Sequence, residues 1–495
     1  MSVNAVRKVN TTAHKSFEGG TIYSPSSPLA VLQMIAASSF FGEPQFYRDK
    51  DGNKNTSVFS TSSCKEFEKV LPNPLTGSPK QIMEKVIDDA LNFNAEETLK
   101  LAAELRNKDN IRVTPQVILT RAAHNTKVKG TGLIRKYADQ IILRGDEPAT
   151  GLAYHLSEFS GKALPNSLKK VWKEYLEKQT DYTLAKYRME NRVVKTVDVV
   201  NLVHAFSDSV NKLVKGELKN TGETWEAIIS EKGSTKEAWT EAVSVMGHMA
   251  LLRNLRNLEQ KEVDQKLYLN KLIETAEKGK QIPFRYLSAY DELRKVGARP
   301  QILDAVEQCL ENSLGNLPRF KGVSISLVDN SGSMWSEKPS EKSSRVNADI
   351  ANLMGVITGK CSDEGYCGIW ASRYAVFPVM KKDSILSQTK ELNKIGQSGI
   401  YGHGTDLKPF FEDAIRTNKH YDNIFVYSDM QLHRYVYDVI KQYRNNVNPK
   451  VMIYLVQVAG YGDTIVPEFY NRVFSIGGWS SGILNFAAKM NQIFE

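Results

Sequence analysis

The feature that most constrains the fold is a regular alternation of short apolar strands and amphipathic helices that begins after Arg319. Neighbouring parallel strands need a crossover between them, and a helix usually supplies it. The alternation therefore predicts a doubly wound, mostly parallel α/β sheet over residues 321–495. The expected elements are, in order, Val323–Asp329, Arg345–Thr358, Gly368–Ser372, Ala375–Met380, Leu386–Ile395, Lys408–Thr417, Ile424–Asp429, Val436–Tyr443, Val451–Val458, Val473–Ile476 and Ile483–Phe494.

A turn rich in oxygen ligands follows the first of these strands. Asp329, Ser331 and Ser333 alternate along this turn, directly after the apolar run that begins at Val323. Open α/β sheets bind ligands at the carboxyl ends of their strands. Oxygen donors without sulfur or imidazole suit Mg²⁺ or Mn²⁺ better than zinc. The turn therefore predicts a metal site, and a capped structural turn is the alternative.

Two later segments supply further oxygen ligands. Thr405 follows the glycine-rich Gly402-His403-Gly404, and Asp429 ends the apolar run that begins at Ile424. Together the five side chains resemble the metal-ion-dependent adhesion site of von Willebrand factor A domains. The resemblance implies a divalent cation with an open coordination position, which an acidic oxygen from a partner completes. Alternatively, the ion only orders the loops. The implied ligands are Asp329, Ser331, Ser333, Thr405 and Asp429.

The residues before Arg319 have a different pattern. We expect residues 1–27 to be an irregular arm and the rest to be mostly short helices. Many short helices joined by Gly, Pro or Asn predict an α-solenoid of helix pairs over residues 1–320. The expected helices are Leu29–Ala37, Gln81–Phe93, Glu96–Asn107, Thr114–His124, Gly132–Leu143, Leu164–Lys178, Val197–Ala205, Lys236–Leu258, Val263–Glu277 and Pro300–Leu314.

Composition and charge indicate which kinds of protein and partner are compatible with this chain. Residues 1–320 carry 46 Lys and Arg against 39 Asp and Glu, whereas residues 321–495 carry 19 against 17. A basic N-terminal part suits nucleic acid or another polyanion. The four cysteines are scattered, no secretory signal is recognisable, and no run of about 18 apolar residues occurs, so we expect a cytoplasmic protein with reduced thiols and no membrane contact.

Two groups of cations are candidates for RNA contact. The first lies between Arg112 and Arg144, where Asp139 is the one acidic residue, and such a group can neutralise several phosphates. The second surrounds Lys186, beside aromatic residues that can stack on unpaired bases. A solvated helix face is the alternative in both cases. The candidates are Arg112, Arg121, Lys127, Lys129, Arg135 and Lys136 in the first group, and Lys169, Lys170, Lys186 and Arg188 in the second.

Several segments of the helical part, read together, resemble the TROVE module of the Ro autoantigen and its bacterial relatives. Their order, and the fusion to a C-terminal A domain, are similar as well. The resemblance covers nearly the whole chain. The segments are Glu104–Asn107 (ELRN), Arg112–Gln116 (RVTPQ), Leu164–Lys170 (LPNSLKK), Ala185–Arg188 (AKYR), Asp198–His204 (DVVNLVH) and Met249–Leu258 (MALLRNLRNL).

This resemblance implies a fold and a set of RNA contacts. TROVE modules fold as a ring of HEAT-like helical pairs, which the A domain helps to close. They bind small structured Y RNAs on the outer surface and take single-stranded ends of misfolded RNA into the central hole. Bacterial relatives pair with exoribonucleases through their RNA.

Individual residues follow from the same resemblance. Lys186 and His204 align with a family lysine and histidine that contact RNA, but Glu190 stands where the family has a second cation. Arg188 or Arg192 is the expected substitute. Arg253 and Arg256 are expected either to face the ring lumen or to pair with acidic residues of a neighbouring helix.

The sequence thus predicts a multidomain α plus α/β protein. A ring-shaped α-solenoid of HEAT-like repeats precedes a doubly wound, mostly parallel von Willebrand factor A domain, in a chain expected to be monomeric. The expected function is Ro-like binding of Y-like noncoding RNA and of misfolded RNA 3′ ends, in RNA quality control or beside an exoribonuclease. No nucleophile with a histidine partner and no phosphate-binding glycine loop is recognisable, so we do not expect an enzyme. The rival hypothesis is a scaffold that captures acidic peptides through the A-domain metal.

Overall fold

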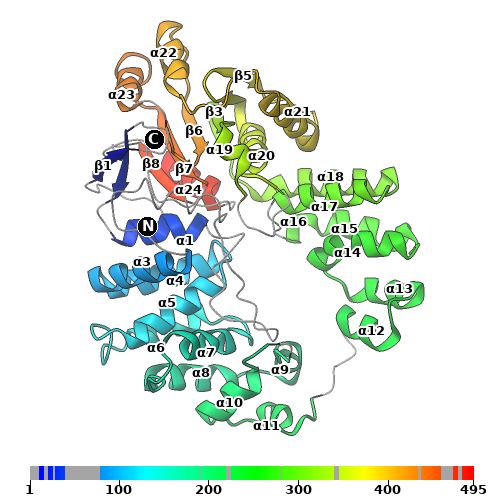
Figure 1. The fold of residues 1–495 in the computed structure, drawn as a ribbon. Coiled ribbons are helices and arrows are strands. Elements are labelled where there is room, and N and C mark those ends of the chain that lie inside the picture. Colours follow the sequence, from blue (N-terminus) through cyan, green and yellow to red (C-terminus); the bar gives the residue numbers. More distant parts are fainter. Residues whose placement is uncertain are drawn as a thin grey trace.

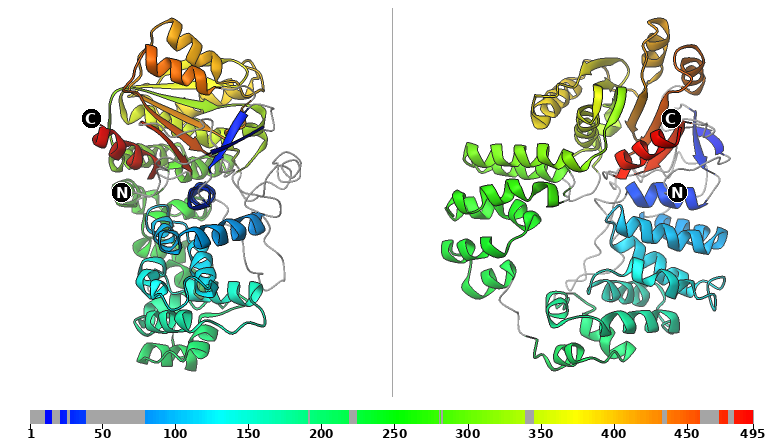
Figure 2. Two further views of the ribbon diagram at one scale, coloured as in Figure 1. Left: turned by 90° about the vertical axis from the view of Figure 1, so that its left-hand side faces the viewer. Right: turned by 180° about the vertical axis from the view of Figure 1, so that it is seen from behind.

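The structure is a computed structural model of the 495-residue chain, shown in Figures 1 and 2. It describes residues 11–15, 21–25, 28–38, 79–190, 192–218, 224–279, 281, 283–338, 345–432, 436–458, 472–477 and 482–494. From its sequence we expect residues 51–79 to be a polar loop, and most of it, together with Cys64, lies outside this set. Cys309, Cys361 and Cys367 are buried free thiols.

The first half of the helical part, here called the first arm, is a series of short helices. Side chains cap several of them: Asn94, Thr180 and Ser207 each accept a hydrogen bond from a backbone amide in the first helical turn. The helices are α1 (Pro28–Ser38), α3 (Pro79–Phe93), α4 (Ala95–Asn107), α5 (Val113–His124), α6 (Leu133–Ile141), α7 (Glu147–Glu158), α8 (Asn166–Glu177), α9 (Asp181–Lys186), α10 (Thr196–Val203) and α11 (Asp208–Lys215).

A second arm of helices leads from there to the sheet. Thr224 and Thr235 cap its first two helices in the same way. Its elements are α12 (Trp225–Lys232), α13 (Lys236–Val245), α14 (His248–Gln260), η2 (Gln265–Leu267), α15 (Leu269–Glu274), α16 (Ala276–Gly279), α17 (Pro283–Lys295), α18 (Pro300–Ser313) and η3 (Leu314–Asn316).

The helices differ from the sequence prediction in two ways. The predicted helix Lys236–Leu258 is broken, because Met246 and Gly247 are extended between α13 and α14. The predicted helix Val263–Glu277 is likewise divided into η2, α15 and α16. In addition, α7, α9, α11, α12 and α17 were not predicted; α9, with six residues, is too short for helical periodicity to reveal.

The prediction of an irregular arm at residues 1–27 is wrong for its described residues, 11–15 and 21–25. Strands β1 (Thr11–Lys15) and β2 (Thr21–Pro25) pair antiparallel, with Thr11 opposite Pro25 and Lys15 opposite Thr21. Threonine, isoleucine and tyrosine favour strands, and the Gly19-Gly20 pair in the sequence between them is a hairpin signal that the high polar content concealed.

The C-terminal part contains a six-stranded sheet, as the alternation predicted. The strand order is β5-β4-β3-β6-β7-β8; all neighbours are parallel except β4 and β5, which are antiparallel. The strands are β3 (Phe320–Asp329), β4 (Ser362–Trp370), β5 (Tyr374–Pro378), β6 (Asn423–Ser428), β7 (Met452–Gln457) and β8 (Val473–Gly477).

Helices cover both faces of this sheet, so it is doubly wound. Helices α20 (Asn347–Lys360), α21 (Ile385–Gln397) and α24 (Gly482–Phe494) share one apolar core with one face. Helices α22 (Lys408–Arg416) and α23 (Tyr437–Asn446) share a separate core with the other face. The short α19 (Gly332–Ser336) follows β3 directly.

The two arms and the sheet form a ring (Figures 1 and 2). The second arm and one face of the sheet share a single core, and Lys360 of α20 pairs with Glu311 of α18 at 2.9 Å. The first arm has a core of its own, and its α1 lies beside β8 at the far edge of the sheet. The sheet therefore joins the two ends of the helical series, as predicted. Within the described residues, no helix has the length and apolar character needed to cross a bilayer.

Candidate functional site

The oxygen ligands predicted from the sequence lie together at the carboxyl end of the sheet. Because β3 and β6 are parallel neighbours with Val328 opposite Tyr427, the turns that follow them meet. The Ser333 hydroxyl donates to the Asp429 carboxylate at 2.7 Å, and the Ser331 and Ser333 hydroxyl oxygens are 3.2 Å apart. The Asp329 carboxylate accepts from the Ser331 amide at 2.9 Å and from the Ser428 hydroxyl at 2.6 Å.

Thr405 lies in a glycine-rich loop that contacts the Asp329 turn. The Gly332 amide donates to the His403 carbonyl at 2.9 Å, which holds the loop against the Asp329 turn. Gly402 has a φ of +83°, and a Cβ there would lie 2.6 Å from the Ser372 hydroxyl oxygen, so glycine is required. The Thr405 hydroxyl is buried and has no hydrogen-bond partner.

These residues fit a hard divalent cation. Burial, and then the nearby Asp429 carboxylate, raise the pKa of Asp329 well above its usual range. A cation between the two carboxylates would offset this repulsion and give the Thr405 oxygen a partner. Within the described part of the chain, no three His, Cys, Asp or Glu side chains form a metal cluster; the present donor set has two carboxylates and three hydroxyls.

A buried chain of amides supports the Asp329 turn, and the sequence reading missed it. The Asn330 side-chain amide donates to the Val328 carbonyl at 3.1 Å and to the Asn352 side-chain carbonyl at 3.0 Å. Asn352 donates in turn to Asn393 at 2.8 Å. A satisfied buried network of this kind holds the turn rigidly. The three asparagines are 22 and 41 residues apart in sequence, so spacing could not reveal them.

The candidate RNA residues around Lys186 lie on α8, at the end of α9 and just after α9 and α10. Lys170, Lys186 and His204 are exposed, whereas Lys169 and Arg188 are half-buried. Arg188, one of the two expected substitutes for the missing family cation, pairs with Glu190 at 3.2 Å, so its charge is partly neutralised.

Phe206 is an exposed aromatic residue that the sequence reading missed. It lies two residues after His204, which caps α10 in the left-handed region with a φ of 53°. Its side chain is 71% exposed, and its amide donates to the Glu177 carboxylate at the end of α8 at 2.9 Å. An exposed ring held in this way is available to stack on an unpaired base.

The cations between Arg112 and Lys136 separate into two kinds. Arg121 is directed inward: its guanidinium donates to Asp88 at 2.7 Å and to the Tyr154 hydroxyl at 2.6 Å, and lies 3.6 Å from Glu84. We therefore assign it a structural role in place of RNA contact. The others are exposed: Arg135 pairs with Glu174, Lys136 pairs with Glu96, Lys127 donates to a carbonyl, and Arg112 and Lys129 form no ion pair within the described residues.

Arg253 and Arg256 have different surroundings, although they lie on the same helix. Arg256 lies 3.9 Å from Glu292, as one of the two sequence hypotheses expected. Desolvation, and then the charges of Arg253 and Arg112, lower the pKa of Arg285 on α17. Arginines of the two arms therefore lie within electrostatic reach of one another, and an anion would stabilise them. Arg285 was not among the predicted residues.

Part of the chain matches a known protein family. Residues 215–354 match the family model of the TROVE domain. This confirms the resemblance expected from the sequence over residues 215–354, which include one of its six segments, Met249–Leu258. The TROVE match includes Arg253, Arg256 and the Asp329 turn, but it begins after the segment that carries Lys186 and His204.

A solved structure resembles the chain over most of its length. It is the crystal structure of the Deinococcus radiodurans Ro (RSR) protein, with a TM-score of 0.53 and 16% sequence identity. The similarity covers 94% of this chain and 99% of that chain. It confirms the fold class, a helical ring followed by a doubly wound, mostly parallel α/β domain. A search of curated proteins by sequence finds no match.

Proposed function

We propose that this chain is a Ro-like RNA-binding protein. The observation that carries the proposal is the combination of a TROVE match with a fold that follows a Ro protein from end to end. The exposed cations of the first arm support it, because exposed lysines without carboxylate partners are the side chains that neutralise phosphates. Binding, not catalysis, is the proposed activity.

The finer proposal concerns which RNA binds where. The cations on α8 and α9, together with His204, would hold a structured noncoding RNA of the Y type on the outer surface. The arginines that the two arms bring together would hold the single-stranded end of a misfolded RNA in the ring. Such a protein would act in RNA quality control or as the RNA-tethered partner of an exoribonuclease, in the cytoplasm and as a monomer.

The oxygen cluster is proposed to hold Mg²⁺ or Mn²⁺. Asp329, Ser331, Ser333, Thr405 and Asp429 would be its protein ligands, as their convergence and the unpartnered Thr405 hydroxyl support. When bound, the ion would offer an exchangeable coordination position to an acidic oxygen. The chain's own residues hold the three ligand-bearing loops together through the buried asparagines and the contact between Gly332 and His403.

The same cluster favours a second candidate function, a scaffold that captures acidic peptides through the metal. The two functions respond differently to conditions. Binding through phosphates weakens with salt at a slope near −0.7 per neutralised phosphate on a single strand. Metal-bridged peptide capture disappears with EDTA.

Fluorescence anisotropy of the full chain with a hairpin RNA bearing a single-stranded 3′ tail tests the proposal. A salt series is run with and without EDTA. Submicromolar binding that weakens steeply with salt and is insensitive to EDTA is expected. Absence of binding to any structured RNA at low salt would overturn the RNA-binding function and leave the metal-dependent scaffold.

A further inference from the structure

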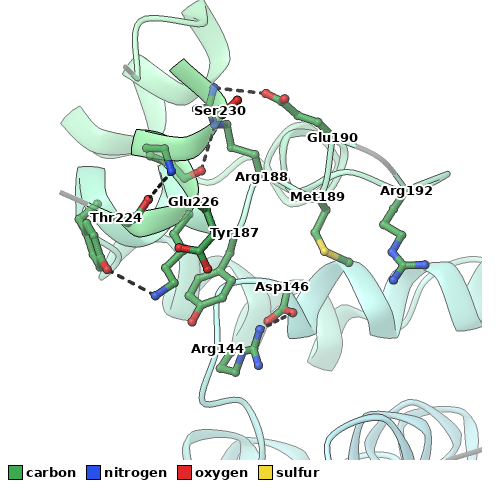
Figure 3. Close-up of a pocket in the computed structure, with 14 residues that line it drawn as sticks. Arg144, Asp146, Tyr187, Arg188, Met189, Glu190, Arg192, Thr224, Glu226 and Ser230 are labelled. Carbon is green, nitrogen blue, oxygen red and sulfur yellow. Dashed lines mark hydrogen bonds and ion pairs between the residues drawn. The ribbon is translucent and has the colours of Figure 1, made fainter. Parts of the chain in front are cut away.

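A pocket of about 640 Å³ lies where the two arms meet (Figure 3). The first arm contributes the loop before α7, helix α9 and the segment that follows it, and the second arm contributes α12. This volume lies within the usual range of small-molecule sites, roughly 300–1,000 Å³. The pocket can therefore enclose a group as large as one nucleotide.

Two tyrosines, four cations and three carboxylates line this pocket, and two of the carboxylates pair with neighbouring arginines. The Arg144 guanidinium lies 4.8 Å from the centre of the Tyr187 ring and pairs with Asp146 at 3.0 Å. The Lys186 ammonium lies 5.5 Å from the Tyr182 ring and 5.9 Å from the Tyr187 ring. Lys186 donates to the Tyr182 hydroxyl at 3.4 Å and forms no ion pair among the described residues, so its charge is available to a phosphate.

The wall that carries Tyr187 is held firmly in place. The Thr196 hydroxyl donates to the Tyr187 carbonyl at 2.5 Å, and the Thr196 amide donates to the Arg188 carbonyl at 3.1 Å. Behind the ring, a Cβ at Gly145 would lie 3.1 Å from the Tyr187 Cβ, so the chain packs closely there. A ring positioned in this way loses little entropy when a base stacks on it.

We propose that this pocket binds one unpaired nucleotide of the bound RNA. Its base would stack on Tyr187, and its phosphate would lie beside Lys186. Rings next to cations suit a nucleotide better than an apolar peptide side chain, because every base presents a π-face and every nucleotide a phosphate. The inference rests on the proposed RNA-binding function and adds a ligand class to it: an extruded base, held in a pocket that both arms line.

The test compares two hairpins that differ by a single bulged 2-aminopurine. Wild-type protein should bind the bulged hairpin on the order of tenfold more tightly than the perfect hairpin, the range expected for one stacked base. Stacking should also quench the 2-aminopurine fluorescence. The perfect hairpin measures the proposed function separately.

Ser230→Trp blocks the pocket from α12, where Ser230 is exposed, without changing a charge. This variant should lose both the tenfold preference and the quenching, and keep the affinity for the perfect hairpin. The control Ser244→Trp, an exposed serine of α13 that does not line the pocket, should behave as wild type.

Three results decide the outcome. Equal wild-type affinity for the two hairpins, or full quenching by Ser230→Trp, overturns the pocket inference. If the protein quenches free 2-aminopurine riboside 5′-monophosphate but shows no preference for the bulged hairpin, the pocket binds a free nucleotide. This result overturns the proposal that its ligand is part of a bound RNA. Failure to bind either hairpin overturns the RNA-binding function itself.

Discussion

The oxygen cluster at the sheet and the basic surface of the helical arms are built on opposite principles. Four of the five side chains in the cluster are buried, and hydrogen bonds join Ser331, Ser333 and Asp429 to one another. The basic surface is exposed, and most of its cations either pair with a nearby carboxylate or extend into solvent. A buried site is thus defined by which residue types are present, whereas an exposed one is defined by which charges remain unpaired.

The largest expected effect is on the cluster. Asp329→Asn should raise the thermal stability of the metal-free protein, because it removes one of two neighbouring buried carboxylates. It should also abolish the stabilisation by Mg²⁺, which for one site at 100 times its Kd is about 2.7 kcal/mol. Thermal unfolding with and without Mg²⁺ measures both. The control Asp383→Asn, at an exposed carboxylate, should change neither, and retention of the Mg²⁺ effect in Asp329→Asn would exclude the cluster as the metal site.

The next effect separates structural cations from RNA-binding ones. Arg121→Met should lower the free energy of unfolding by about 2 kcal/mol, since it leaves the partners of a partly buried guanidinium unsatisfied. It should not change the salt dependence of RNA binding. Lys129→Met is the matched control. It should leave the free energy of unfolding unchanged and make the salt dependence of RNA binding shallower. Denaturant unfolding and anisotropy distinguish them, and an altered salt slope in Arg121→Met would return Arg121 to the RNA surface.

Charge reversal on the outer surface should weaken RNA binding by about tenfold. Lys170→Glu with Lys186→Glu removes two exposed cations, and the salt slope should become shallower by roughly 1.4, at about 0.7 per lost phosphate contact. Lys382→Glu with Lys390→Glu, two exposed lysines of the α/β domain, controls for net charge. If both pairs weaken binding equally, the attraction is diffuse and the assigned surface is incorrect.

The smallest effect should appear only with a single-stranded tail. Arg253→Gln with Arg285→Gln should reduce affinity for a tailed hairpin by about fivefold, as expected for two charge-assisted phosphate contacts, and leave a tail-less hairpin unaffected. Arg256→Gln, on the same helix but paired with Glu292, is the control. An equal loss for both RNAs would show that these arginines do not read the tail.

The oxygen cluster and the basic surface also differ in how much of each could be predicted from the sequence. The order of strands and helices was predictable, because period-2 and period-3.6 patterns are local. Four side chains of the oxygen cluster could be predicted to converge because they lie at or just after strand ends; Thr405 joined them only through the resemblance to A domains. The strand pair Thr11–Lys15 and Thr21–Pro25 was missed because of its polar content, and α9, α11 and α12 were missed because they have only 6, 8 and 8 residues. Length does not explain why α7 and α17, with 12 and 13 residues, were missed.

The sequence by itself determined the two architectures, the doubly wound sheet and the residues of the oxygen cluster, since these depend on local periodicity and on residue type at strand ends. Only the tertiary structure decided which cations are available. Arg121 and Lys129 are alike in sequence terms, but Asp88 and Tyr154 surround Arg121 once the helices pack. Arg285 and the pocket at Tyr187 likewise depend on contacts between segments far apart in the chain, where pairing is set by packing and not by spacing.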